Sequence, residues 1–228
     1  MKLVLYSGGQ SRSNHRLHEA VVKLARKRTP RGALQMTYIP FCADAASVFF
    51  HRAIRRYRSH GVERFFSLSV DVPHSSSEIK TALESDIIYL AGGNTFYFLK
   101  HLRESGMLDR LKKFAKNGGV LAGLSAGGLI MSPTVGLAAD QGLGPDENEV
   151  GVRDFRALGL FDFEFSPHFC GTRSEIKAHL NYSLKTPYPI YAAADGGGMI
   201  IDGNVRTVCG EAMLFHRGTC TQLIRSRP

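Results

Sequence analysis

The chain has 228 residues, of which 43% are hydrophobic and 21% charged, a composition typical of one globular α/β domain, so we expect a single domain over residues 1–228. No apolar run approaches the roughly 20 residues needed to cross a bilayer, which argues against a membrane-spanning helix. The formal net charge of +9 is compatible with nucleic-acid binding or with attraction of small acidic substrates.

The basic residues are spread along the chain rather than gathered in one patch. Those of segments 23–31, 51–58 and 110–114 lie in or beside helical patterns, where Lys and Arg commonly form the solvated face. We therefore expect a small-molecule partner rather than nucleic acid. The four cysteines form no C-x-x-C pair and show no zinc-ligand spacing, so we expect free thiols in a reducing compartment and no bound metal.

Strand-like apolar runs alternate with helix-length segments over the first half of the chain. The N-terminal run, 2–8, is too short for a signal peptide, so we interpret it as a first strand of a cytoplasmic protein. Similar runs follow at 34–40, 64–70, 86–93 and 118–125. This alternation predicts βαβ units, a parallel sheet and right-handed crossovers.

Further strand-like runs follow in the second half, at 161–168, 189–197, 199–204 and 212–218. The last part of the chain, about 40 residues, has short strands separated by turn signals and predicts a hairpin region at the sheet edge. Ligands of open α/β sheets bind at the carboxyl ends of the strands. Glycine, Ser, His and Asp are concentrated at those ends, which indicates an active site there.

Ser125 stands at a sharp turn between an expected strand and an expected helix. A serine in such a turn adopts a strained backbone, so its neighbours must be small, which Gly123, Ala126 and Gly127 satisfy. The pattern predicts a serine hydroxyl lifted out of the sheet. It also places the Ala126 N–H at a helix N-terminus, facing an oxyanion on a carbon attacked by Ser125. The alternative interpretation is a purely structural turn.

A nucleophilic serine needs a base, and the chain has nine histidines. Most lie in polar helix-like segments where a surface position is expected: His15, His18, His51, His60, His101 and His179. His168 differs because it ends an apolar run between Pro167 and Phe169, at a restrained strand end. We predict His168 as the base. There are two alternatives. His168 is a structural loop histidine with its hydrogen bonds satisfied, or it forms a nucleophile pair with Cys170.

Asp195 follows a run of small and apolar residues and precedes three glycines. A carboxylate in such a strand end is costly to bury unpaired, and a histidine partner removes that cost. We predict that Asp195 orients His168; a role as a turn cap is the alternative.

Another expected strand end, that of the run 86–93, contains Gly93. We predict that Gly93 supplies a second oxyanion N–H, while Asn94 or Thr95 caps the following helix.

Together these segments resemble the S51 serine peptidase family, that of peptidase E, the α-aspartyl dipeptidase. The resemblance rests, in order along the chain from residue 87 to residue 218, on "AGGNTFYFLK", "GLSAGG", "SPHF", "TR" and "ADGGGMIIDGNVRTVCGEAMLFHRG". It implies a flavodoxin-like three-layer α/β sandwich with a mostly parallel sheet, like class I glutamine amidotransferase domains.

The resemblance also implies roles for individual residues. Ser125 matches the family nucleophile, His168 its general base, and Gly93 and Ala126 its oxyanion-hole amides. Asp195 occupies a position where the family has Glu, so its side chain is one methylene shorter.

The same resemblance implies the substrate, because family members cleave Asp-X dipeptides. Arg173 matches an arginine that binds the substrate's aspartyl carboxylate, and Asn94 and Thr172 are further candidates for substrate binding. Only Cys170 and Gly171 separate the His168 segment from Thr172, a shorter loop than in the family, which predicts a more open pocket.

We therefore predict a cytoplasmic serine exopeptidase that hydrolyses dipeptides or short peptides with N-terminal aspartate through Ser125, His168 and Asp195. The expected partner is a small peptide with an acidic N-terminal residue, with no cofactor and no membrane; the oligomeric state, monomer or homodimer, stays open. One alternative is a cyanophycinase-like or divergent S51 hydrolase of other acidic peptides. Another is a non-catalytic α/β module that binds an anionic ligand or nucleic acid.

Overall fold

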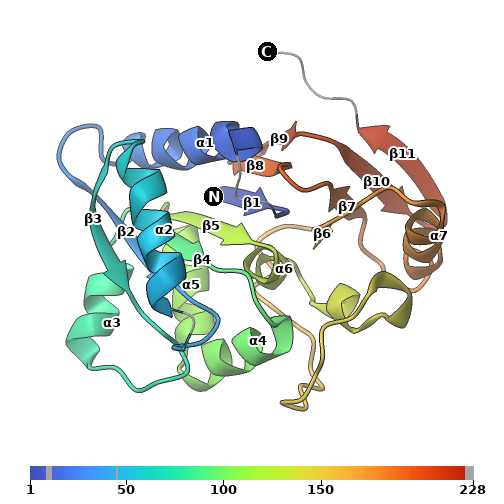
Figure 1. Ribbon diagram of the computed structural model, residues 1–228, viewed down its shortest axis with the longest axis horizontal. Helices are drawn as coiled ribbons and strands as arrows, with labels where there is room; N and C mark the ends of the chain where they lie inside the picture. Colours follow the sequence, from blue (N-terminus) through green and yellow to red (C-terminus); the bar gives the residue numbers. More distant parts are fainter. Residues whose placement is uncertain (9–11, 45, 224–228) are drawn as a thin grey trace.

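The computed structural model describes residues 1–8, 12–44 and 46–223 (Figure 1). The strands are β1 (Lys2–Tyr6), β2 (Leu34–Ile39), β3 (Val62–Ser67), β4 (Ile87–Leu90), β5 (Val120–Leu124), β6 (Glu164–Ser166), β7 (Ile190–Ala193), β8 (Gly198–Asp202), β9 (Val205–Cys209), β10 (Ala212–His216) and β11 (Thr219–Leu223). The α-helices are α1 (His15–Arg26), α2 (Ala46–Arg58), α3 (Ser76–Leu83), α4 (Thr95–Glu104), α5 (Met107–Lys116), α6 (Ala126–Met131) and α7 (Arg173–Tyr182). Short 3₁₀ helices cover Arg12–Asn14, Gly136–Ala139 and Gln141–Leu143.

A seven-stranded sheet forms the centre of the molecule, in the order β3-β2-β4-β5-β1-β8-β9. The first five strands of this order run parallel, and β8 and β9 add an antiparallel edge. One apolar core packs α1 and α2 against one face; a second core packs α3 to α6 against the other. The predicted three-layer sandwich with a mostly parallel sheet is therefore confirmed.

A second sheet, in the order β11-β10-β7-β6, lies beside the first and carries α7 (Figure 1). The sequence predicts one hairpin region at the edge of a single sheet, and the structure corrects this expectation. The hairpin β8–β9 extends the large sheet, whereas β10–β11 belongs to the small one. The chain passes from β7 of the small sheet to β8 of the large sheet through residues 194–197, the turn that contains Asp195.

Parallel pairing brings together the chain segments that leave the sheets. In the large sheet Tyr6 of β1 is paired with Leu124 of β5, so the residues that follow both strands emerge side by side. In the small sheet Ser166 of β6 is paired with Ala192 of β7, and the same holds for the segments beyond them. All four segments contribute to the site described below.

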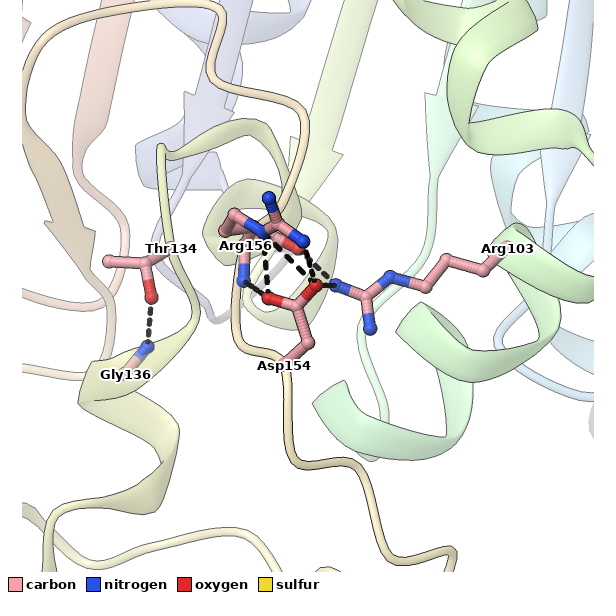
Figure 2. Close-up of polar contacts among 5 residues, drawn as sticks. All are labelled: Arg103, Thr134, Gly136, Asp154 and Arg156. Carbon is pink, nitrogen blue, oxygen red and sulfur yellow. Dashed lines mark hydrogen bonds and ion pairs between the residues drawn. The ribbon is translucent and has the colours of Figure 1, made fainter.

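The Asp154 carboxylate lies in the long connection between α6 and β6 and contacts α4 (Figure 2). Asp154 accepts hydrogen bonds from the backbone N–H and the guanidinium of Arg156, at 2.7–3.1 Å, and pairs with Arg103 of α4 at 3.8 Å. The bonds from Arg156 hold the pKa of the Asp154 carboxyl well below its usual range. This exposed cluster ties the connection to α4, and the connection in turn supplies one wall of the site.

Candidate active site

Ser125 stands between β5 and α6 with φ 50° and ψ −113°, a conformation that few non-glycine residues adopt. The strain is held by the backbone: Ser125 N–H donates to Tyr6 O at 2.9 Å, and Ser125 O accepts from Gly128 N at 2.8 Å. The turn is also tight, because a Cβ added to Gly123 would lie 2.4 Å from Gly127 O. Small neighbours are therefore required, as the sequence predicts for a serine placed in such an elbow.

The side chains of Ser125, His168 and Asp195 form one line of hydrogen bonds. His168 Nε2 lies 2.8 Å from Ser125 Oγ, and His168 Nδ1 lies 2.7 Å from Asp195 Oδ1. Because a carboxylate only accepts, Nδ1 carries the proton of the neutral ring, and Nε2 is left to accept the hydroxyl proton of Ser125. The shorter Asp195 side chain thus reaches the histidine. Such an arrangement can take a proton from serine and stabilise the imidazolium that results.

Cys170 does not form the alternative pair. Its thiol is exposed and donates to the backbone carbonyl of His168 at 3.4 Å, whereas the imidazole ring of His168 is engaged with Ser125. None of the four cysteines, all of which lie in the part of the chain that the structure describes, forms a disulfide. Within residues 1–8, 12–44 and 46–223, no three His, Cys, Asp or Glu side chains are placed to hold a metal ion.

Ser7, directly after β1, connects these loops and was not predicted as a site residue. It is fully buried; its hydroxyl donates to Ala193 O at 2.8 Å, lies 3.2 Å from Asp195 Oδ1, and accepts from His168 N–H at 2.7 Å. Ser7 therefore fixes the backbone of His168, whose φ of 60° is itself unusual, relative to the Asp195 carboxylate. A serine at the carboxyl end of a buried strand was the only signal for this position in the sequence.

Gly8 allows the close approach of His168 and Asp195. A Cβ on Gly8 would lie 2.3 Å from His168 Cε1 and 2.5 Å from Asp195 Oδ1, distances that no side chain tolerates. The backbone carbonyl of Gly8 also accepts from Gly196 N–H at 3.0 Å, which joins this segment to the Asp195 turn. Only glycine leaves the space that the histidine–carboxylate pair occupies.

The two predicted oxyanion donors flank Ser125. Ala126 is the first residue of α6, so its N–H has no acceptor within that helix. Gly93, in the turn after β4, has φ 148°, and a Cβ there would overlap the ring of Phe41 at 2.2 Å. The neighbouring Gly92 packs against the nucleophile turn, since a Cβ on it would lie 3.3 Å from Ser125 Cβ. The backbone of both turns therefore comes close to Ser125.

A cavity of about 160 Å³ opens beside Ser125 and His168. Leu129 supplies an apolar wall, and Asp146 and Glu175 supply carboxylates. Both carboxylates are held by backbone groups: Asp146 accepts from Thr95 N–H at 2.8 Å, and Glu175 accepts from the N–H groups of residues 170 and 171 at 2.9 and 3.0 Å. The cavity is small, carries two carboxylates, and directly adjoins the serine.

The three residues predicted to bind substrate lie at helix N-termini. Asn94 caps α4 by accepting from Tyr97 N–H at 2.9 Å and donates to Glu147 O at 2.7 Å; Thr172 caps α7 by accepting from Glu175 N–H at 3.3 Å. Arg173 is the exposed first residue of α7. None of these three residues is among the described residues that line the cavity. Glu175 and His179 of α7 do line it.

Two histidines expected at the surface are buried. His18 lies 3.1 Å from Tyr6 OH, and burial, helped by the Arg56 charge, lowers its pKa to about 3. His179 donates from Nδ1 to Glu175 O at 2.9 Å, so its Nε2 accepts from Ser166 Oγ, also at 2.9 Å. Burial lowers the pKa of His179, which keeps this cavity-lining ring neutral. The expectation failed because both rings find polar partners on other elements.

The sequence matches known proteins over most of its length. The family model of peptidase family S51 matches residues 3–208, so the chain belongs to that family. It is accordingly a serine-type peptidase, and the predicted family resemblance is confirmed. Among the described residues, no helix combines the length and apolar character needed to cross a membrane.

Individual relatives agree with this assignment. Peptidase E of Escherichia coli O6:K15:H31 is 28% identical over 176 residues, 77% of this chain and 72% of the relative. Peptidase E of Citrobacter koseri is 33% identical over 109 residues, 47% of this chain and 45% of the relative.

Two solved structures share the fold. A candidate peptidase E from Listeria monocytogenes EGD-e has a TM-score of 0.67 at 22% identity, covering 98% of both chains. A peptidase from an acI-B1 actinobacterium has a TM-score of 0.71 at 16% identity, covering 99% of this chain and 95% of the other.

Proposed function

We propose that Ser125, His168 and Asp195 are the catalytic residues of this peptidase and that it acts by acyl transfer. Ser125 attacks the peptide carbonyl while His168 Nε2 takes the hydroxyl proton. His168, oriented by Asp195, then gives that proton to the leaving amine, and water hydrolyses the acyl-enzyme by the reverse sequence. The continuous line of hydrogen bonds at 2.8 and 2.7 Å is the observation that carries this proposal.

The backbone N–H groups of Gly93 and Ala126 stabilise the tetrahedral oxyanion in this proposal. Two features support the assignment: the free N–H of Ala126 at the start of α6, and the approach of the Gly92–Gly93 turn to Ser125. Backbone donors fixed in a strained turn need no rearrangement when charge develops. Their contribution is therefore present from the start of the reaction.

The acidic cavity beside Ser125 supports an exopeptidase. Asp146 and Glu175 face the space next to the nucleophile, where they would attract the free ammonium group of an N-terminal residue. An acylated N-terminus carries no charge and is larger, so the enzyme should discriminate against it. Peptides would thus be cleaved after their first residue.

We further propose that this first residue is aspartate, with Arg173 binding its side-chain carboxylate. The sequence similarity to peptidase E and the position of Arg173 on the helix that carries Glu175 and His179 support this specificity. Because Arg173 is exposed, its long side chain is available to a substrate that enters from solvent. The net charge of +9 also favours acidic peptides.

The test compares Asp-Leu, Asn-Leu and Glu-Leu as substrates of the wild-type enzyme, Ser125→Ala and Arg173→Gln. Ser125→Ala should lose hydrolysis of all three. Arg173→Gln should lose the preference for Asp-Leu over Asn-Leu and keep the hydrolysis of Asn-Leu. Activity that survives Ser125→Ala would overturn the mechanism, and equal wild-type rates on Asp-Leu and Asn-Leu would overturn the specificity.

A further inference from the structure

A second and larger cavity, of about 560 Å³, lies on the α2 side of the large sheet. Its walls come from α2, from β2 and the segment after it, from the turn that follows β4, and from the last residue of β5. It is lined by aromatic and basic side chains and by the oxyanion turn: Tyr38, Phe41, Phe49, Arg52, Arg56 and Gly93. The acidic cavity belongs to the other side, where α4 and α6 cover the sheet.

The second cavity borders the nucleophile. Gly92, which lines it, is so close to Ser125 that an added Cβ would lie 3.3 Å from Ser125 Cβ. Leu124, the residue before Ser125, lines it as well. A peptide carbonyl held at Ser125 therefore has a cavity on each side, one with carboxylates and one with guanidinium groups.

Arg52 and Arg56 place their positive charges on the same face of α2, because they are four residues apart. The Arg52 guanidinium lies 5.5 Å from the centroid of the Phe49 ring, a cation–π contact that orients it at the rim of the cavity. Arg56 is half-buried, and its charge acts on the groups beneath it: it adds to the burial that lowers the pKa of His18. The cavity thus combines two guanidinium groups with aromatic walls.

We propose that this cavity binds the leaving residue of a dipeptide substrate, with Arg52 and Arg56 holding its C-terminal carboxylate. The inference rests on the proposed function, which places the scissile carbonyl at Ser125. A dipeptide carries an ammonium group at one end and a carboxylate at the other. The two cavities match this charge distribution, with Asp146 and Glu175 on the acyl side and the two arginines on the leaving side.

This subsite has two consequences for specificity. A longer peptide has an uncharged amide where the dipeptide has its carboxylate, so it forfeits the charge-assisted bonds of both arginines. Tyr38, Phe41 and Leu124 offer apolar surface to the side chain of the leaving residue, so apolar leaving residues are favoured. The two arginines of α2 therefore make the enzyme prefer dipeptides over longer peptides.

The experiment measures kcat/KM for Asp-Leu and for Asp-Leu amide, which differ only in the C-terminal charge. Wild type should prefer the free acid about 10- to 100-fold, the range expected for hydrogen bonds to a charged group. Arg52→Gln should lower kcat/KM for the acid about tenfold and kcat/KM for the amide much less, so that the wild-type preference for the acid shrinks. Arg56→Gln should act in the same direction, with its melting temperature measured because the residue is half-buried. Arg55→Gln, an exposed arginine of the same helix outside the cavity, is the matched control and should keep the wild-type ratio.

Equal wild-type kcat/KM on the acid and the amide would overturn the subsite while leaving the proposed mechanism intact. The subsite is also overturned if Arg52→Gln lowers kcat/KM equally for the acid and the amide. It is overturned as well if Arg55→Gln lowers the preference for the acid as much as Arg52→Gln does. If wild type hydrolyses neither substrate above the level of Ser125→Ala, the proposed function fails and the subsite fails with it.

Discussion

His168 Nδ1 lies 2.7 Å from Asp195 Oδ1, although the two residues belong to different loops of the small sheet. Their side chains are 52% and 56% exposed, so burial does not hold this pair together. Exposed ion pairs contribute little by themselves, because water competes for both partners. The geometry instead comes from Ser7, which bonds both loops from a fully buried position, and from the space that Gly8 leaves. The β1 terminus therefore positions a pair that lies outside its own sheet.

Asp195→Asn should lower kcat strongly while leaving KM nearly unchanged. The amide can present an N–H to Nδ1, which would favour the wrong tautomer of His168, with the proton on Nε2 facing Ser125. We expect a loss of roughly 10²- to 10⁴-fold in kcat for Asp-Leu. Asp195→Glu tests the length of the side chain: the space beside Gly8 fits the shorter acid, so this variant should also lose activity. Full activity of Asp195→Glu would contradict the account of this fit.

Gly8→Ala should impair catalysis through the position of His168. The added methyl group would meet His168 Cε1 at 2.3 Å, so the ring must move away from Ser125 or from Asp195. A misplacement of this size costs on the order of 10²-fold in kcat. Steady-state kinetics and a thermal melt measure the two effects separately. A Gly8→Ala variant with wild-type kcat would contradict the prediction, because the His168 ring would then tolerate the added methyl group.

Glu164 should make stability depend on pH. Burial raises the pKa of its carboxyl to about 7, even though Tyr182 and Thr186 donate to it. The folded state therefore binds more protons than the unfolded chain between about pH 4.5 and 7, and the free energy of unfolding falls as pH rises through this range.

Glu164→Gln removes this titration and keeps the side-chain shape. Its stability should be close to that of wild type at pH 5 and higher at pH 8.5, by about 1–3 kcal/mol. Denaturant unfolding at the two pH values measures the difference. Glu63→Gln, on the exposed side of β3, is the control and should leave the wild-type pH dependence unchanged. A Glu164→Gln variant that is less stable than wild type at pH 8.5 would contradict the prediction.

The sequence predicted the parts of the site that depend on local patterns. Ser125 is flanked by residues that only a tight strand–helix turn requires, and His168 and Asp195 stand where apolar runs end. The second sheet was not predicted, because the runs that form β6, β7 and β10 are apolar like those of the large sheet, and the polar β11 was not among the predicted runs. Which strands pair is decided by contacts between residues far apart in the chain.

The residues that sequence reasoning misplaced or missed are those whose partners come from other elements. His18 and His179 read as polar helix residues, and their buried partners Tyr6 and Ser166 lie on strands. In the sequence Ser7 does not differ from other serines at strand ends. Its role depends on partners from β7 and the His168 loop, which only the fold brings to it. Arg52 and Arg56 likewise have the sequence pattern of a solvated helix face, and only the fold places them in one cavity with Gly92 and Gly93.

The most direct test of the central claim is covalent labelling of the native enzyme with a fluorophosphonate, followed by mass spectrometry of its peptides. The mechanism predicts one adduct per chain, on Ser125, formed in proportion to the loss of Asp-Leu hydrolysis. Ser125→Ala should not be labelled, and His168→Ala should be labelled much more slowly because its serine lacks a base. Full inactivation with the adduct on another residue, or an unmodified Ser125 in inactivated enzyme, would contradict the account.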